Sequence, residues 1–212
     1  MIFLSQLLVL KQVTINLADP ARAAISLRFF KTGRGEYGEG DQFLGLTVPQ
    51  CRKIAKQFCD ITQSEGESLL HSKIHEERLI ALIILVDQFA RGNETQQKRI
   101  YRLYLRSTEW INNWDLVDTS ADKIVGKYLL NKSAGILEKL AQSKSLWERR
   151  IAMIATLAFI RANRFEETFR IAELLLSDSH DLIHKAVGWM LREVGKRDRG
   201  AEEKFLKKHY QI

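Results

Sequence analysis

The chain has 212 residues, of which 45% are hydrophobic and 28% charged, and it carries a formal net charge of +7. Its two cysteines, Cys51 and Cys59, are too few for a disulfide framework or a four-cysteine zinc site, and they indicate reduced thiols in a cytoplasmic protein. The excess of positive charge favours a polyanionic partner, and charge alone does not distinguish DNA from RNA or anionic lipid.

The first ten residues are mostly apolar, but they are too short to span a bilayer, which needs about 20 helical residues. They also lack the positive start and the small-residue cleavage site of a signal peptide. We therefore predict a first helix that docks on the rest of the chain. No membrane segment and no membrane partner are expected.

The segment 33–45 contains five glycines and superficially resembles a phosphate-binding loop. It lacks the Gly-Lys-Ser/Thr ending and a preceding strand, and its acidic residues would repel phosphate. A connecting loop with left-handed turns is the better prediction, because glycine adopts that conformation without steric cost. An early helix is expected to follow around Pro49.

From residue 66 onward the apolar residues recur at helical spacing, and no segment shows the two-residue alternation of a strand. Short polar breaks separate the segments, and Thr95 offers an N-cap for the second of them. The chain is therefore predicted to be all-α. The expected helices cover residues 68–90, 96–105, 115–130, 134–142, 147–162, 165–176 and 182–196.

The helices also repeat. Residues 77–83 read Glu-Arg-Leu-Ile-Ala-Leu-Ile, and residues 148–154, at an offset of 71, read Glu-Arg-Arg-Ile-Ala-Met-Ile. A further copy at 184–190 follows at an offset of 36, and a step of 36 from the first copy reaches 113–119. This period predicts an α-solenoid of HEAT-like repeats in one domain, residues 1–212. Small residues at one shared position would let neighbouring helices approach closely: Ala81, Ala152 and Gly188.

Trp114 and Asp118 are four residues apart, which places an indole and a carboxylate on one face of a helix. Such a pair can hold a cation, for example an alkylated nucleobase. The alternative is structural, with the tryptophan in the core and the aspartate as a helix cap. Arg150 lies 36 residues after Trp114, and Trp189 lies 71 after Asp118. The repeat therefore predicts that all four residues line one wall, the concave groove of the solenoid.

Three segments resemble the signatures of the AlkD-type DNA alkylation repair glycosylases. Residues 114–118 read Trp-Asp-Leu-Val-Asp, residues 147–150 read Trp-Glu-Arg-Arg, and residues 185–192 read Lys-Ala-Val-Gly-Trp-Met-Leu-Arg. The glycine-rich segment and Pro49 resemble the family's N-terminal part, so the match covers about residue 24 to the end. Residues 1–23 match poorly, and Phe29 stands where some members carry a tyrosine.

The resemblance implies a HEAT-like solenoid that excises cationic N3- and N7-alkylated purines from double-stranded DNA without flipping the base, leaving an abasic site. It implies that Asp118 is the catalytic carboxylate, that Trp114 and Trp189 are groove tryptophans, and that Arg150 is a groove arginine, which we expect to hold a phosphate. No cofactor is expected. A bacterial-type monomer, located in the cytoplasm and on the nucleoid when bound to DNA, is expected.

Several further cations are candidates for contacts with the DNA backbone, and an ordinary solvated helix face is the alternative for each of them. Lys185, Arg192 and Lys196 lie on the helix of Trp189, and by resemblance Arg192 and Lys196 match DNA-contacting positions. Arg52 and Lys56 lie on the early helix. The tail lysines are interpreted as general electrostatic attraction: Lys204, Lys207 and Lys208.

Two histidine pairs have the spacing of metal ligands on a helix, His71 with His75 and His180 with His184. Neither pair has an evident cysteine or carboxylate that completes a tetrahedral site, so no metal is expected. Two alternatives to a glycosylase remain open. One is a non-catalytic HEAT-like module that binds branched or damaged DNA, and the other is a protein-binding scaffold.

Overall fold

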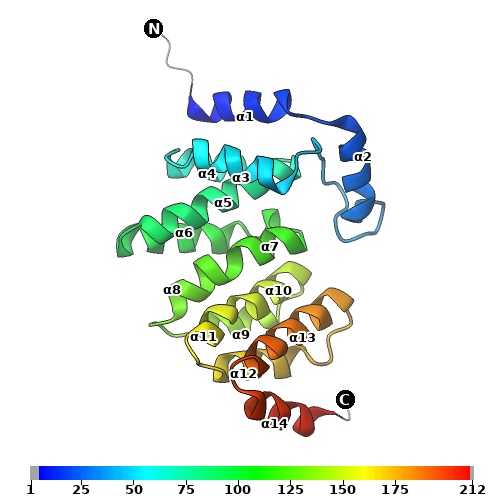
Figure 1. Cartoon of the computed structure of the whole chain (residues 1–212), viewed down its shortest axis with the longest axis vertical. Helices are drawn as coiled ribbons and strands as arrows, with labels where there is room; N and C mark the ends of the chain where they lie inside the picture. Colours follow the sequence, from blue (N-terminus) through cyan, green and yellow to red (C-terminus); the bar gives the residue numbers. More distant parts are fainter. Residues whose placement is uncertain (1–4, 211–212) are drawn as a thin grey trace. The chain divides into compact units, whose positions relative to one another are not determined.

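The computed structural model describes residues 5–210 (Figure 1). Residues 1–4, the start of the apolar N-terminal stretch, and residues 211–212 lie outside the described residues. The part described is all-α and contains no β-strand, which confirms the predicted fold class. The chain divides into two compact units, Met1–Leu116 and Val117–Ile212. The single-domain organisation and the concave groove stay predictions.

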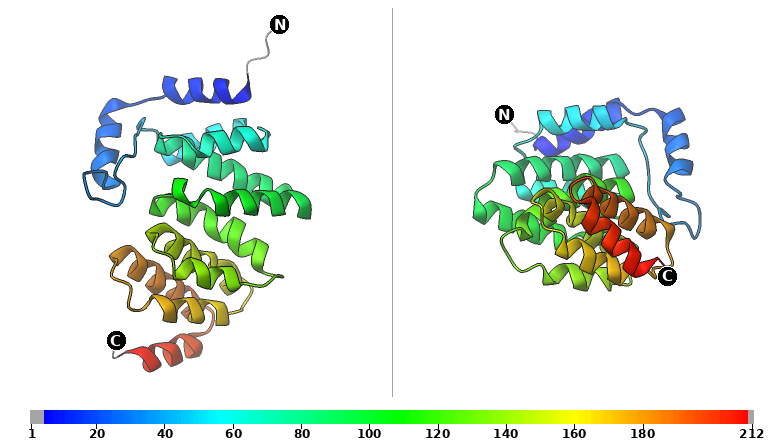
Figure 2. Two further views of the ribbon diagram at one scale, coloured as in Figure 1. Left: turned by 180° about the vertical axis from the view of Figure 1, so that it is seen from behind. Right: turned by 60° about the horizontal axis from the view of Figure 1, so that its bottom comes forward.

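The described part of unit 1 holds six complete α-helices, followed by a short 3-10 helix (Thr108–Trp110). The α-helices are α1 (Gln6–Asn16), α2 (Pro20–Phe29), α3 (Val48–Gln57), α4 (Gln63–Leu70), α5 (His75–Arg91) and α6 (Glu94–Arg106). The apolar helix α5 is central, and α3 and α4 pack on it. α1 docks on α3 and α4 through the fully buried Leu10, which confirms the predicted first helix. α2 stands apart from these helices at the edge of the unit, between two connecting segments (Figures 1 and 2).

The starts of the early helices follow from their sequences. α3 begins with a capping box between Thr47 and Gln50, and Pro49 lies in its first turn, where a missing N–H costs nothing. The segment before it is the predicted connecting loop. Its left-handed turns occur at three glycines with φ between 78° and 88°: Gly35, Gly40 and Gly45.

The second unit continues α7 (Trp114–Ala121), which begins at the end of the first. Its other elements are a π-helical segment (Asp122–Gly126), α8 (Lys127–Leu129), α9 (Gly135–Ala141), α10 (Leu146–Ala155), α11 (Leu157–Arg161), α12 (Glu166–Leu175), α13 (Asp181–Gly195) and α14 (Arg199–His209). α10 packs on α9, α12, α13 and the π-helical segment. α14 packs on α13.

Three predicted boundaries are wrong. The helix expected at 68–90 is broken between Leu70 and His75, where Ser72 and Ile74 leave the helical path. The cap of α6 is Asn93, whose side chain accepts a hydrogen bond from the Gln96 N–H at 3.0 Å, and not Thr95. The helix expected at 147–162 is interrupted at Thr156, whose hydroxyl donates to the Met153 carbonyl.

The role predicted for Gly188 is also wrong. A Cβ built on Gly188 meets no atom within 4 Å, so no neighbouring helix approaches it. Ala81 and Ala152 are fully buried, as expected of contact positions. The close approach in unit 2 lies at Gly126 instead, where a Cβ would fall 2.2 Å from the Ala155 carbonyl oxygen.

These two glycines give a matched pair of stability predictions. Gly126→Ala should lower the free energy of unfolding by about 1–3 kcal/mol, because the new methyl group overpacks against α10. Gly188→Ala should raise it by roughly 0.5–1 kcal/mol, because alanine has the higher helix propensity and the space is open. Urea unfolding followed by circular dichroism measures both, and equal effects would contradict this packing.

Candidate functional site

Trp114 begins α7 and is half-buried against two aromatic residues, the last residue of α2, Phe29, and its C-cap, Phe30. Its ring stacks on Phe30 with 5.5 Å between centroids, and Phe29 meets it edge-on at 5.9 Å. The Asn113 side chain accepts a hydrogen bond from the Trp114 N–H at 2.9 Å. Phe29 is itself 61% exposed. The indole is therefore held in place by the end of α2, yet it keeps part of its surface open.

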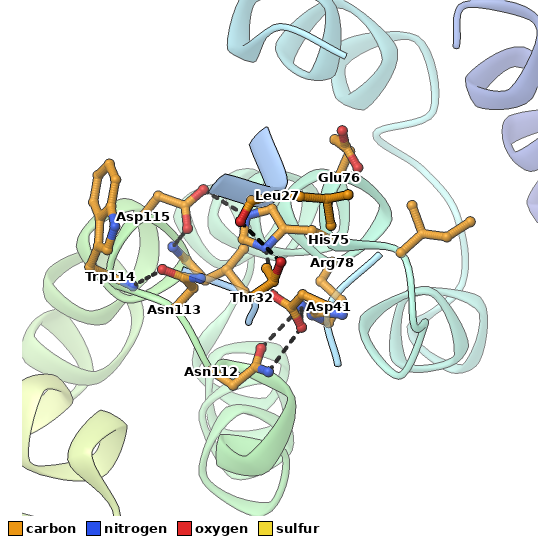
Figure 3. Close-up of polar contacts among 12 residues, drawn as sticks. Leu27, Thr32, Asp41, His75, Glu76, Arg78, Asn112, Asn113, Trp114 and Asp115 are labelled. Carbon is orange, nitrogen blue, oxygen red and sulfur yellow. Dashed lines mark hydrogen bonds and ion pairs between the residues drawn. The ribbon is translucent and has the colours of Figure 1, made fainter. Parts of the chain in front are cut away.

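A buried polar network lies beside this aromatic group (Figure 3). The His75 ring is 1% exposed, with Nδ1 3.1 Å from an Asp41 oxygen and Nε2 2.8 Å from an Asp115 oxygen. Arg78, 2% exposed, donates to the other Asp41 oxygen at 2.7 Å and to the Asn112 side chain at 3.1 Å. The network thus joins the glycine-rich loop, α5 and the segment that leads into α7.

The protonation states in this network follow from its geometry. Burial alone would raise the pKa of Asp41, but the hydrogen bond with His75 and the charge of Arg78 outweigh it, and the pKa lies below its usual range. Burial lowers the pKa of His75, but hydrogen bonds to Asp115 and Asp41 raise it to about 9. His75 is therefore an imidazolium at neutral pH, with both ring N–H groups donating to carboxylates.

Glu76 fixes the loop that carries Asp41 and leads to α3. Its carboxylate accepts hydrogen bonds from three successive backbone N–H groups, those of residues 44–46, at 2.7–3.2 Å. Gly45 in this run has no room for a side chain, since a Cβ would fall 2.2 Å from the Asp19 carbonyl oxygen before α2. The start of α2 is thereby tied to the start of α5.

In unit 2, Asp118 lies one turn into α7, so it is not the helix cap of the structural alternative. Arg150 of α10 forms a bidentate ion pair with Asp118, with Nε 2.9 Å from Oδ1 and Nη2 2.8 Å from Oδ2. Arg150 also donates to the Leu182 carbonyl at 2.5 Å. Its side chain is 6% exposed and that of Asp118 is 20% exposed. The ion pair thus fixes the orientation of the carboxylate, whose side chain stays partly exposed.

Trp189 is half-buried on α13. Glu193 lies one turn further along the same helix, and its carboxylate accepts a hydrogen bond from Lys196. The Lys196 ammonium is the largest of the effects that hold the pKa of Glu193 below its usual range, and Trp189 contributes a smaller one. The structure gives Trp114 and Trp189 partly open surfaces, and their role toward a ligand stays a prediction.

The remaining candidate cations are exposed. Arg52 and Lys56 lie one turn apart on α3 and border a cleft of about 400 Å³, which Ala55, Cys59 and Ile83 also line. On α13, Lys185 pairs with Asp181 at 2.7 Å and Lys196 pairs with Glu193 at 2.5 Å. Arg192 is exposed on the same helix. Solvent screens exposed ion pairs and makes them weak, so these lysines can exchange a carboxylate for a phosphate at little cost.

The histidine pairs have structural partners. His71 stacks on Trp110 and contacts the Ser107 hydroxyl, and His75 belongs to the buried network. The His180 side chain accepts a hydrogen bond from the Leu182 N–H, and His184 contacts the Asp178 carbonyl. Within residues 5–210, no group of three or more histidine, cysteine or acidic side chains is placed to hold a metal ion. None of the described helices is long and apolar enough to cross a bilayer.

Sequence reasoning missed the buried network. Asp41 looked like one of three acidic residues of a solvated loop, and His75 and Arg78 lay inside a predicted continuous helix. The available signal was a charged run, His-Glu-Glu-Arg at 75–78, immediately before an apolar helix. Asp115, which lies between the two candidate residues of the same motif, had no assigned role.

The chain is similar to a known protein family and to two solved structures. The profile of a family described as DNA alkylation repair enzyme matches residues 10–212. A structure described as a predicted DNA alkylation repair enzyme from Enterococcus faecalis is similar, with a TM-score of 0.71 and 17% identity over 90% of this chain and 89% of that chain. The smu.31 protein of Streptococcus mutans UA159 is 19% identical over 96% and 90%, with a TM-score of 0.55. At these identities the two structures share the fold. No curated protein matches the chain.

Proposed function

The chain belongs to the DNA alkylation repair enzyme family, and on that premise we propose that it is a monofunctional DNA glycosylase for cationic N3- and N7-alkylated purines in duplex DNA. It hydrolyses the N-glycosidic bond and leaves an abasic site. One observation carries the proposal. Asp118 is a partly exposed carboxylate, fixed in orientation by Arg150 and placed four residues after the half-open Trp114 in α7.

The chemistry needs little more than a carboxylate. Alkylation at N7 or N3 makes the purine a cation and hence a good leaving group, so no general acid has to protonate it. Positive charge then develops on the deoxyribose as the bond breaks. A carboxylate about 4 Å from that charge stabilises it by about 4 kcal/mol at an effective dielectric constant near 20. Asp118 is the proposed carboxylate, and it also orients the attacking water.

The two tryptophans bind the charged nucleoside in this proposal. The face of an indole is negative, and a cation over it gains about 0.5–2 kcal/mol. Trp114 is the better supported of the two, because Phe29 and Phe30 hold its ring and its surface is partly open. Trp189, half-buried on α13, has the second role. No amine nucleophile is assigned, so no lyase step is expected.

Arg150 has a double role in the proposal. Its guanidinium opposes the field of Asp118, so a lone Asp118–Arg150 pair is a weakened catalyst. Arginine has more N–H donors than the contacts with Asp118 and Leu182 use. A DNA phosphate that accepts from the remaining donors neutralises the guanidinium and restores the field of the carboxylate. Arg150 thereby couples DNA binding to catalysis.

We propose that the lesion stays in the duplex, held against the protein surface rather than flipped into a pocket. The support is the family resemblance and the partial exposure of Trp114 and Asp118. A cationic base that binds to indole faces and a carboxylate needs no enclosing cavity. This mode also admits bulky adducts.

The exposed cations bind the DNA backbone. Lys56→Ala should reduce the slope of log K against log salt concentration by about 1, since each phosphate contact contributes about −0.9. The matched control is Lys139→Ala, an exposed lysine of α9 outside the proposed contact set, which should leave the slope unchanged. Fluorescence anisotropy with an undamaged duplex measures both slopes, and equal slopes in the two variants would remove Lys56 from the interface.

The proposal is tested by incubating the protein with methylated duplex DNA and then heating with alkali, which cleaves the strand at abasic sites. Cleavage at 7-methylguanine and 3-methyladenine is expected, with bulkier N7 adducts also released. Tight binding to DNA junctions without cleavage would favour the non-catalytic DNA-binding module. A protein-binding scaffold would show little salt-dependent DNA affinity.

A further inference from the structure

We propose that His75 is a positioning residue for Trp114, fixing the indole from two sides, through Asp115 next to it in the chain and through Phe30 against its ring. The inference deepens the proposed function and rests on it for its activity readout. It adds a residue of another helix, α5, to the working parts of the site.

The first connection runs through hydrogen bonds. Both ring nitrogens of His75 face carboxylate oxygens, Asp41 at 3.1 Å and Asp115 at 2.8 Å. Because carboxylates only accept, both nitrogens must donate, which requires the imidazolium. Charge-assisted hydrogen bonds of this kind are among the stronger polar contacts in proteins. Asp115 directly follows Trp114, so the backbone that carries the indole is anchored to α5.

The second connection runs through rings. The imidazolium contacts Phe30 at 4.8 Å and Phe43 at 4.6 Å between centroids, and these two phenyl rings stack at 5.1 Å. Phe30 in turn stacks on Trp114 at 5.5 Å. A charged ring at the base of such a stack attracts the faces of its neighbours. The position of the Trp114 indole therefore depends on His75 through both the hydrogen bonds and the ring contacts.

The charges around His75 require its proton. Asp41 faces it from the loop and Asp115 from α7, while Glu76 and Arg78 flank it on its own helix. Cys51 of α3 interacts electrostatically with Glu76 and Asp115, and burial raises the pKa of its thiol to about 12, so it is neutral. The Glu76 carboxylate accepts hydrogen bonds from backbone N–H groups, and the Arg78 guanidinium forms an ion pair with Asp41. Loss of the His75 proton therefore leaves Asp115 without a cation beside Trp114.

The pH dependence follows from the sign of this pairing. The pKa of His75 is raised from 6.5 to about 9, so the imidazolium is present through neutral pH and is lost as the pH rises through about 9. Trp114 should then lose its anchoring at alkaline pH. Removing one of the two carboxylates should lower the pKa of His75 and move this transition to lower pH.

The experiment labels the protein with 5-fluorotryptophan, so that its four tryptophans give fluorine NMR signals assignable by single Trp→Phe variants. His75→Gln should shift or broaden the Trp114 signal and leave those of Trp147 and Trp189 in place. The matched control is His71→Gln, because His71 stacks on Trp110 at 5.2 Å in the same unit. It should move the Trp110 signal and spare that of Trp114.

Two further measurements keep the proposal open to refutation even if His75→Gln does not fold. In the unmodified chain the Trp114 signal should titrate with a midpoint near 9, and in Asp115→Asn the midpoint should fall. Where His75→Gln does fold, its turnover number for 7-methylguanine release should drop about tenfold or more, with KM little changed, since small misplacement of a catalytic group is costly.

Three results would overturn the inference: an unmoved Trp114 signal in folded His75→Gln, a pH midpoint that Asp115→Asn does not change, or undiminished turnover. The NMR measurements need no DNA. If the unmodified protein releases no alkylated base while the Trp114 signal responds as described, the proposed function fails and the positioning contact stands.

Discussion

Asp118→Asn is expected to abolish detectable release of 7-methylguanine. The substitution removes one negative charge from beside the developing sugar cation and keeps the size of the side chain. At about 4 kcal/mol of lost transition-state stabilisation, the rate falls by nearly 10³-fold. The amide oxygen can still accept one of the two hydrogen bonds from Arg150, so the chain should still fold, with about 1–3 kcal/mol less unfolding free energy because the buried guanidinium keeps only a neutral partner.

Single-turnover release from a methylated duplex measures the rate, and circular dichroism with anisotropy measures the fold and the binding. Asp87→Asn is the matched control, since Asp87 is an exposed partner of Arg91 with no proposed catalytic role, and it should retain full activity. Full activity in Asp118→Asn would remove the catalytic carboxylate from the mechanism.

Asp41→Ala is expected to be among the most destabilising single substitutions in unit 1. Asp41 is 7% exposed. Its carboxylate accepts hydrogen bonds from Arg78, Asn112 and the protonated His75 ring. Its removal leaves two cations in the interior without their shared anion. Breaking a buried ion pair in this way typically costs about 3–5 kcal/mol of unfolding free energy.

Urea unfolding of the unmodified chain and of Asp41→Ala tests this expectation. Asp60→Asn is the control and should leave the unfolding free energy nearly unchanged, because Asp60 also pairs with an arginine but is 74% exposed, and solvent screens such a pair. A loss below about 1 kcal/mol in Asp41→Ala would show that the network is not what holds the loop to α5.

Two carboxylates of one short motif have different environments. Asp115 is 14% exposed and pairs with His75, so it is part of the support of Trp114. Asp118 is 20% exposed and pairs with Arg150 of α10. The family resemblance assigns the catalytic role to Asp118, and that assignment stays a prediction. Each carboxylate pairs with a buried cation, and Asp118 is the more exposed of the two.

The sequence was sufficient for the fold class and for most helices. The apolar spacing of 165–176 and 182–196 corresponds to α12 and α13 within a few residues, because amphipathic packing in this chain is local and periodic. The link between Arg150 and the motif of Asp118 was also visible, since a repeat offset reports which helices stand side by side. The two side chains do contact each other.

The sequence was insufficient where burial depends on distant segments. His75 and Arg78 lie at the start of a helix and look like its solvated first turn. They are buried because the glycine-rich loop folds over them, with Glu76 holding the loop backbone. No periodicity encodes that contact. The prediction for Gly188 was wrong for a different reason. Gly188 occupies the same repeat position as two buried alanines, but no neighbouring helix packs against it.

The most direct test of the central claim is the release of free 7-methylguanine from a duplex that carries one such base, under single-turnover conditions at neutral pH, with the product identified by mass spectrometry. The proposed function predicts release of the intact base and an abasic site in unbroken DNA, with no release of unmodified guanine. Tight binding of the methylated duplex without any release of the base would contradict it.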